Sequence, residues 1–231
     1  MTKAVISGDI VAYTSLNDDD RDLLEGAFKV LLELLKKDFN VYGRIIKGDY
    51  LECVVPEPAD ALRVALIIKS FVKSIQIATI FNKKTNKRIK FFKTHGIRLA
   101  IGYGNLTRYD TDKGIIDGEA IYLSGRAINE EATYNKERIV IKNTLFFVSA
   151  NENLNKEFEP LLALIDVLMG KATIRQSEVL NLKLLNYSEE AITKKLNISQ
   201  PVVNQHSTSI GWNAIEKAII HFNQVIKTQL T

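Results

Sequence analysis

Cysteine is nearly absent from this sequence, which excludes the small disulfide-rich folds. The 231 residues include one cysteine, Cys53, so no disulfide can form within the chain. Proline is also scarce, with 4 residues, and no window reaches the roughly 20 apolar residues that a membrane-spanning helix needs. The first residues are apolar only briefly before Asp9, so no signal peptide is expected. These absences predict a cytoplasmic protein that has no membrane partner.

The composition itself is that of an ordinary folded domain, with 46% hydrophobic and 25% charged residues. The formal net charge of +4 is a weak indication of an anionic partner. Much of the positive charge lies in one short segment, formed by Lys83, Lys84, Lys87, Arg88, Lys90 and Lys93. We interpret this segment as a solvated loop between a helix and a strand, with a phosphate or nucleic-acid contact as the alternative.

The spacing of apolar residues predicts an alternation of strands and helices over the first 150 residues. Strands are expected at 3–7, 44–47, 51–55, 96–103, 138–141 and 145–149, and helices from 18, over 59–77 and over 119–132. Pro56 and Pro58 end the third strand, and a loop rich in aspartate and glycine follows the fourth. The order βαββαβ is ferredoxin-like, with helices covering one face of an antiparallel sheet. We therefore expect an α+β domain over residues 1–150.

No further strand is predicted after residue 150. Helical spacing is found at 155–169, 175–185, 188–196, 200–209 and 211–227. Gly170 separates the first two of these helices and is the predicted hinge between domains. The second domain, 151–231, is thus expected to be small and all-α, with a helix-turn-helix at about 175–209 and a C-terminal helix.

Two aspartates stand at positions that suit a metal site. Asp9 ends the first predicted strand, and Asp49 lies at the tip of the predicted hairpin. In the ferredoxin-like order these strands are neighbours, so the two carboxylates are expected to meet at one rim of the sheet. One or two carboxylates, with water and phosphate, are what Mg²⁺ bound to a nucleotide requires, and Mg²⁺ or Mn²⁺ is the predicted cofactor. The alternative is that both are turn residues that bond backbone N–H groups.

Four segments resemble, in order and spacing, the motifs of class III nucleotidyl cyclases. They are Ile6–Ser15 around the first aspartate, Arg44–Val54 with its Gly-Asp hairpin, the strand Ile97–Gly104, and the helical segment Gly118–Ala127. The resemblance implies a nucleotidyl-cyclase-type core, a bound nucleotide and a head-to-tail homodimer with sites at its interface. It also implies that Asp9 and Asp49 bind metal and that the nucleotide contacts Ile10, Ala12, Tyr13, Thr14, Gly48, Tyr122 and Arg126.

The sequence departs from that family where the nucleotide is read. Arg126 matches the arginine that stabilises charge on the phosphates and is the candidate catalytic residue, but Tyr122 replaces the family's asparagine. Ile45 and Ile115 stand where the family carries residues that read the base, and isoleucine cannot hydrogen-bond a base edge. Three interpretations stay open: a nucleotide sensor without turnover, an active nucleotidyl cyclase with a different base preference, and an inert dimer scaffold.

The segment from Tyr187 to His206 resembles the helix-turn-helix of bacterial regulators. Ser188 is the expected cap of the first helix and Ser199 that of the second, with Pro201 in the first turn and Val203 packed under the turn. In this geometry the second helix enters the major groove. The predicted base readers are Gln200, Asn204 and Gln205, and the predicted phosphate contacts are Arg175, Lys194 and Lys195. The alternative is a helical module for dimerisation or another protein interaction.

The pairing of a cyclase-like core with a C-terminal helix-turn-helix is similar to the SatD family of small bacterial proteins, over nearly the whole chain. The leading hypothesis is therefore a DNA-binding regulator whose first domain senses a nucleotide with Mg²⁺. The expected partners are a nucleotide, double-stranded DNA and a second copy of the chain.

Overall fold

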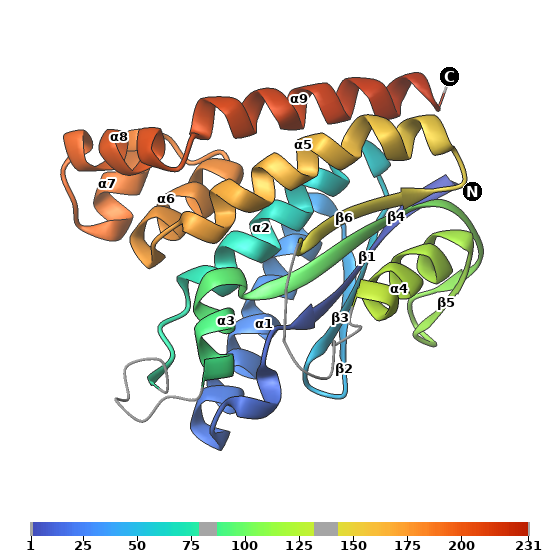
Figure 1. Cartoon of the computed structure of the whole chain (residues 1–231), viewed down its shortest axis with the longest axis horizontal. Coiled ribbons are helices and arrows are strands. Elements are labelled where there is room, and N and C mark those ends of the chain that lie inside the picture. The colour runs from blue at the N-terminus through green and yellow to red at the C-terminus, as the bar shows by residue number, and fades with distance from the viewer. Residues whose placement is uncertain (1, 79–86, 132–142, 231) are drawn as a thin grey trace.

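The described residues of this computed structural model, 2–78, 87–131 and 143–230, form a six-stranded sheet with helices on both faces (Figure 1). The strand order is β2 (Tyr42–Ile46), β3 (Tyr50–Val55), β1 (Thr2–Ile10), β4 (Ile97–Asp110) and β5 (Ile115–Gly118), all paired antiparallel. A sixth strand, β6 (Leu145–Ser149), pairs with β4 in parallel. The order β2-β3-β1-β4 is the ferredoxin-like order, so the mixed α+β sheet that the sequence predicts is confirmed.

Helices cover both faces of the sheet, whereas the sequence predicted helices on one face only. On one face lie α1 (Asp18–Phe39) and α2 (Ala61–Ser74), whose apolar residues pack with Ala4, Ile6 and Ile10 of β1. On the other face α4 (Glu119–Glu131) packs on the residues of opposite parity, such as Val5. A side chain at Gly102 would overlap the carbonyl oxygen of Ala120, so glycine is what lets α4 approach β4 closely.

Two predicted loops are wrong because they carry regular structure. The Asp- and Gly-rich segment after residue 103 continues β4 to Asp110 and turns into β5, where backbone pairing outweighs the weak local strand propensity. Four of the six cations of the basic segment belong to helix α3 (Lys87–His95), which buries Ile89 and Phe92 while Arg88, Lys90 and Lys93 are exposed. The strand expected at 138–141 lies outside the described residues.

The helices after the sheet end within a few residues of their predicted bounds. They are α5 (Glu152–Lys171), α6 (Ile174–Leu184), α7 (Glu189–Leu196), α8 (Gln200–Ser209) and α9 (Trp212–Thr228). Gly170 is not a hinge, because it continues α5 by backbone bonding and the chain leaves helical geometry only at Ala172. None of the described helices has the combination of length and apolar character that crossing a membrane requires.

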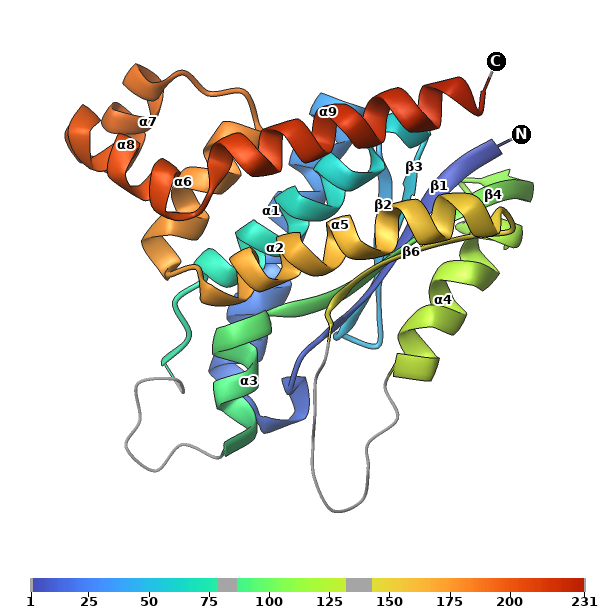
Figure 2. The same cartoon turned by 45° about the horizontal axis from the view of Figure 1, so that its top comes forward.

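One hydrophobic core runs through both predicted domains. Phe158 of α5 and Phe222 of α9 are fully buried and form T-shaped contacts with Phe147 of β6, with ring centroids 4.9 and 5.7 Å from it. Figures 1 and 2 show α5 and α9 lying along α2, above the sheet. The domain boundary near residue 150 stays a prediction, because the hydrophobic core continues across it without a break.

Only the far end of the helical region has a separate small core. Ile192 of α7 and Val203 of α8 pack with Val179 and Leu182 of α6 in a cluster distinct from the main core. In Figure 2, α7 and α8 lie at one end of the molecule, away from the sheet. The two short helices are therefore held mainly by α6.

Candidate functional site

Strand pairing brings the two predicted metal-binding aspartates together. Asp9 lies on β1 opposite Tyr50 of β3, and the next residue, Ile10, donates its backbone N–H to the carbonyl oxygen of Asp49 at 3.0 Å. The hairpin tip is tight because Lys47 and Gly48 both have positive φ, of 54° and 80°. The backbones of Asp9 and Asp49 are thus adjacent at one rim of the sheet, as expected.

The Asp9 carboxylate has a partner that the sequence did not reveal. Arg98 is directly opposite Asp9 on β4 and donates from Nε to Oδ1 at 2.9 Å and from Nη2 to Oδ2 at 2.5 Å. The Arg98 side chain is 9% exposed and that of Asp9 22%, so this is a largely desolvated, two-pronged ion pair. The available signal was an arginine in the middle of an apolar strand, Ile97–Ala100. Its partner could not be named without the strand register.

The loop after β1 lies against the hairpin tip. Ala12 has a left-handed φ of 59°, and a short 3-10 turn, η1 (Tyr13–Ser15), follows it. The Tyr13 hydroxyl donates to Oε1 of Glu25 at 3.3 Å and lies 2.9 Å from where a side chain at Gly48 would begin. Burial and the Glu25 carboxylate raise the pKa of Tyr13, so the hydroxyl stays a donor near neutral pH.

Two other predicted nucleotide-binding residues of this loop, Ile10 and Thr14, differ in the atoms that a ligand could reach. Ile10 is 4% exposed and packs in the main core, so only its backbone is left for a ligand, and its N–H is already bonded to Asp49. Thr14 is exposed, and its carbonyl oxygen accepts from Arg21 at 3.2 Å. The structure therefore groups Asp9, Asp49, Tyr13, Gly48 and the turn that contains Ala12 and Thr14.

Tyr122 and Arg126 lie on α4, which covers the face to which Asp9 points. Ser7 and Asp9 share that face because side chains alternate along a strand, and Ser7 Oγ bonds Ser124 Oγ of α4 at 2.8 Å. Tyr122 is 62% exposed and donates to Asp117 at 2.5 Å. Arg126 is exposed, and no described residue forms a hydrogen bond or ion pair with it. Neither side chain makes a described contact with the two aspartates.

The positions that read the base in the resembling family are apolar here. Ile45 packs against the main hydrophobic core, and Ile115 is a half-buried residue of β5. Arg44, beside Ile45, pairs with Glu52 at 2.6 Å and also donates to the carbonyl oxygen of Gly114. The bond to Gly114 links the hairpin to the β4–β5 turn, so Arg44 is already engaged in holding these two parts together.

The donors at the rim suit one small hard cation. Asp9 and Asp49 supply carboxylate oxygens, the ligands that Mg²⁺ and Mn²⁺ prefer, and each Asp9 oxygen keeps a free lone pair beside its bond to Arg98. Among the described residues no group of three or more His, Cys, Asp or Glu side chains comes together. A metal ion at this rim would therefore need water and phosphate oxygens to complete its shell.

The predicted base readers of the last helices lie on the surface of α8. Gln200, Asn204 and Gln205 are exposed, and the first two are four residues apart on one side of the helix. Asn204 accepts from Thr208 at 3.1 Å and Gln200 donates to Glu189 at 3.4 Å, so both amides have only weak local partners. Ser188 caps α7 at 3.2 Å as predicted, whereas Ser199 makes no side-chain cap to α8.

The predicted phosphate contacts are divided between two places. Lys194 and Lys195 are exposed in the last turn of α7, where the first pairs with Glu190 at 2.7 Å and the second lies over the Tyr187 ring at 5.4 Å. Arg175 is in the first turn of α6, pairs with Glu178 at 2.8 Å and lines a cavity beside α2 and α3. The structure thus groups the two lysines with α7 and α8 and associates Arg175 with another feature.

Comparison with known proteins gives a likeness of fold. No protein-family model matches the chain, and no curated protein matches it. Two structures of a bacterial light-regulated adenylyl cyclase are 17% identical to it, cover 64% of this chain and 43% of that one, and have a TM-score of 0.43. The catalytic core of a rhodopsin-guanylyl cyclase with converted specificity, in complex with ATPαS, is 20% identical, covers 54% of this chain and 70% of that one, and has a TM-score of 0.38. This chain spans less than half of the adenylyl cyclase that it matches, and at such identity the likeness concerns the mixed α+β fold alone.

Proposed function

We propose that this protein is a nucleotide sensor, in which the rim with Asp9 and Asp49 binds a nucleotide together with Mg²⁺ or Mn²⁺. The observation that carries the proposal is the placement of Asp9 near the end of β1 beside Asp49 in the β2–β3 turn, where the backbone N–H of Ile10 donates to the carbonyl oxygen of Asp49 at 3.0 Å. Membership of the SatD family, a head-to-tail homodimer and a cytoplasmic location belong to the same proposal.

The chain's own residues would divide the work of binding. Asp9 and Asp49 would hold the metal ion, which when bound neutralises phosphate charge and orients the phosphates. Arg98 keeps the Asp9 carboxylate in one orientation before any ligand arrives. The Tyr13 hydroxyl, beside the hairpin tip, is a donor within the same loop cluster. Arg126 of α4, with which no described residue forms an ion pair, would stabilise the phosphates, in its own chain or in a partner's.

Binding without turnover is favoured by what the site lacks. Ile45 faces the hydrophobic core and Ile115 carries no polar side-chain atom, so base selection of the family's kind has no polar groups to use. Tyr122 donates the hydrogen bond of its hydroxyl to Asp117, whereas an asparagine amide would offer both a donor and an acceptor. The alternative is an active nucleotidyl cyclase with atypical base selection, and the third candidate is an inert dimer scaffold.

Substitution of Asp49 is expected to abolish the stabilisation by nucleotide and metal. A nucleotide at 100 times its dissociation constant adds about 2.7 kcal/mol to folding, so the melting temperature of the wild type should rise by roughly 5 to 10 °C. Asp49→Asn keeps the hairpin shape but removes the charge that the metal requires. A thermal-shift panel of nucleoside mono-, di- and triphosphates with Mg²⁺ or Mn²⁺ checks this expectation.

Asp112→Asn is the matched control for that panel, since Asp112 is also an aspartate in a hairpin turn, the exposed turn between β4 and β5. A shift that is as large in Asp49→Asn as in the control would remove the metal role of Asp49. Chromatography of the same mixtures after incubation separates sensor from enzyme. Pyrophosphate release that disappears in Asp49→Ala would make the cyclase alternative the leading one.

We also propose that α7 and α8 form a helix-turn-helix that binds double-stranded DNA. The observations that favour it are the exposed amides of Gln200 and Asn204 on one side of α8 and the adjacent exposed Lys194 and Lys195 in α7. Among the residues from Lys171 onward, seven are basic and four acidic, which implies modest affinity and strong dependence on salt. If DNA is not bound, a protein-interaction module is the remaining interpretation.

Removal of both lysines of α7 is expected to weaken binding to all DNA sequences by a similar factor. Lys194→Ala/Lys195→Ala removes two phosphate contacts, so the slope of log affinity against log salt should fall by about 2. Lys36→Ala/Lys37→Ala is the matched control, because these two lysines are also adjacent, exposed and in the last turn of a helix, α1. Gel shifts of a mixed-sequence duplex pool from low to moderate salt give both slopes, and no wild-type shift at low salt would contradict the DNA proposal.

A further inference from the structure

A cavity of about 480 Å³ lies where α5 gives way to α6, beside the end of α2 and the end of α3. Four of its eleven lining residues have apolar side chains: Ile75, Phe92, Ala172 and Ile174. The remainder includes four cationic residues, one from each of these helices, and no acidic one: Lys73, Lys93, Lys171 and Arg175. The volume is that of a small-molecule site, and the lining has both an apolar and a positively charged part.

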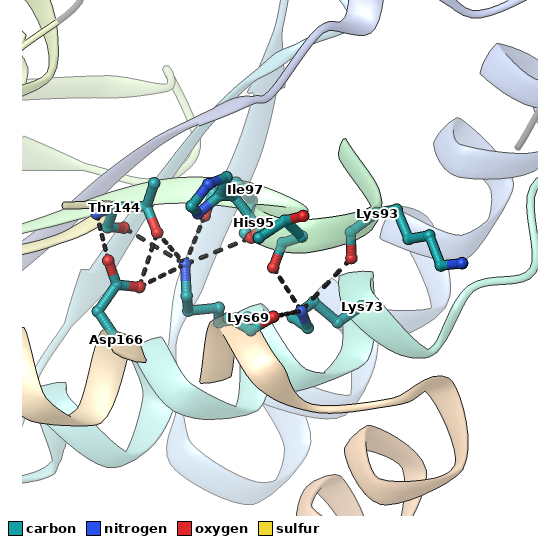
Figure 3. A network of polar contacts seen from close by, with 9 residues as sticks. Lys69, Lys73, Lys93, His95, Ile97, Thr144 and Asp166 are labelled. Carbon is teal, nitrogen blue, oxygen red and sulfur yellow. Dashed lines mark hydrogen bonds and ion pairs between the residues drawn. The ribbon is translucent and has the colours of Figure 1, made fainter. Parts of the chain in front are cut away.

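The cavity adjoins a network of buried charges that does not balance (Figure 3). Lys69 is fully buried and pairs with the buried Asp166 at 3.2 Å, so these two charges neutralise one another. Lys73, one turn later on α2, is 6% exposed, and no described carboxylate forms an ion pair with it. Among the described residues, this network therefore holds two ammonium groups, Lys69 and Lys73, against the one carboxylate of Asp166, and the ammonium without a carboxylate partner, Lys73, belongs to the cavity wall.

Lys73 is held by carbonyl oxygens in place of a counter-charge. Its Nζ donates to Thr94 O at 2.5 Å, and longer bonds reach Lys93 O at 3.5 Å and Gly170 O at 3.4 Å (Figure 3). Burial and the neighbouring Lys69 lower the pKa of Lys73 to about 8, so the group is still mostly charged at pH 7. Burial also lowers the pKa of His95 to about 4, so that ring adds no charge. A desolvated cation without an anion is costly, and an anion in the cavity would relieve the cost.

The start of α6 adds to the positive potential of the cavity. Ile174 and Arg175 are its first two residues, both line the cavity, and the positive end of the helix dipole lies there. Thr173 and Gln176 already cap each other, so the first turn is formed before any ligand binds. The helix terminus thus supports a site that the cavity and the unbalanced lysine define.

We propose that this cavity binds a small amphiphilic anion, with an apolar body against Ile75, Phe92 and Ile174 and one carboxylate or phosphate toward Lys73. The site is separate from the rim with Asp9 and Asp49 and is independent of the nucleotide proposal. A ligand here would contact α2 and α3 on one side and α6 on the other. Because α7 and α8 pack on α6, a ligand in the cavity would stabilise the helix that holds them.

Decyl phosphate, decanoate and decanol test the proposal by isothermal titration calorimetry with the full chain. The two anions are expected to bind, and decanol, which has the same chain without charge, is expected to bind at least tenfold more weakly. The relative affinity of the phosphate and the carboxylate identifies the preferred head group. Equal binding of decanol would contradict an anion site, and so would the absence of binding by both anions.

Substitutions in the lining test whether the anions bind in this cavity. Ile174→Glu introduces a carboxylate into the lining and should weaken binding of decyl phosphate at least tenfold, whereas Lys93→Ala, at the exposed edge, should weaken it by a smaller factor. Leu164→Glu is the matched control, since Leu164 is a surface residue of α5 that is 68% exposed and outside the lining. If Ile174→Glu, confirmed as folded by circular dichroism, binds as the control does, the anions bind elsewhere and the inference is wrong.

Discussion

Asp166→Ala is expected to lower the free energy of unfolding by about 3–5 kcal/mol, the cost of leaving a buried charge without its partner. Asp166 lies on α5 and accepts from the backbone N–H of Thr144 at 2.5 Å and from its hydroxyl at 2.7 Å. Its pair with Lys69 joins α2 to α5, and its bonds to Thr144 join both to the residue before β6. Lys69 is fully buried, so after the substitution its ammonium has only the oxygens of Ile97, His95 and Thr144.

Urea unfolding followed by circular dichroism measures this loss, with Asp112→Ala as the exposed control. The double variant Lys69→Met/Asp166→Leu should recover much of the stability, because it removes both charges together. Burial alone would raise the pKa of Asp166, but Lys69 and the two Thr144 bonds outweigh it and hold the pKa below its usual value. The stabilisation is therefore present above about pH 4 and is lost as the pH falls further. A change below 1 kcal/mol in Asp166→Ala would contradict the role given to this pair.

Phe222→Ala is expected to destabilise the whole chain by about 3–5 kcal/mol in a single transition. Phe222 of α9 is fully buried, with its ring 4.6 Å from that of Phe158 and 5.7 Å from that of Phe147. Because Phe147 belongs to the sheet, a cavity here removes contacts from both predicted domains at once. Calorimetric unfolding should show one peak that moves to lower temperature.

Ile220→Ala is the control for that substitution, because Ile220 is on the same helix but 50% exposed, and its change should stay below about 1 kcal/mol. Two resolved transitions, with the second unmoved by Phe222→Ala, would mean that the sheet and the helices unfold as separate domains. The predicted boundary near residue 150 would then separate two units that unfold independently.

Much of the fold could be predicted because its signals are local. A run of residues with high strand propensity predicted β6 at its observed bounds, and the Gly48-Asp49 pair predicted the β2–β3 hairpin. The helices after residue 150 followed from spacing and from caps such as Ser188. The wrong predictions arose where distant contacts decide. β5 exists because β4 pairs with it, and Gly170, inside α5, has a carbonyl oxygen that accepts from Lys73 of α2 at 3.4 Å.

The candidate site was predictable in its aspartates but not in its partners. Asp9 and Asp49 stand out as acidic residues at strand ends, and the order of elements predicts that they are neighbours. Arg98 could be assigned to Asp9 only from the register of β1 and β4. Lys69 and Asp166 are 97 positions apart in sequence, and each sits in a helix where a charged residue usually faces solvent. Their pairing follows from tertiary structure alone.

The most direct test of the central claim is the Mg²⁺ dependence of nucleotide affinity, measured by calorimetry with the nucleotide that gives the largest thermal shift. The wild type is titrated in Mg²⁺ and again in EDTA, and Asp49→Asn is titrated in both. The sensor proposal predicts that Mg²⁺ tightens binding by about tenfold or more, at least 1.4 kcal/mol, in the wild type, and that this gain is absent in Asp49→Asn. Equal affinity with and without Mg²⁺ in the wild type, or an undiminished gain in Asp49→Asn, would contradict a metal–nucleotide site at the rim of Asp9 and Asp49.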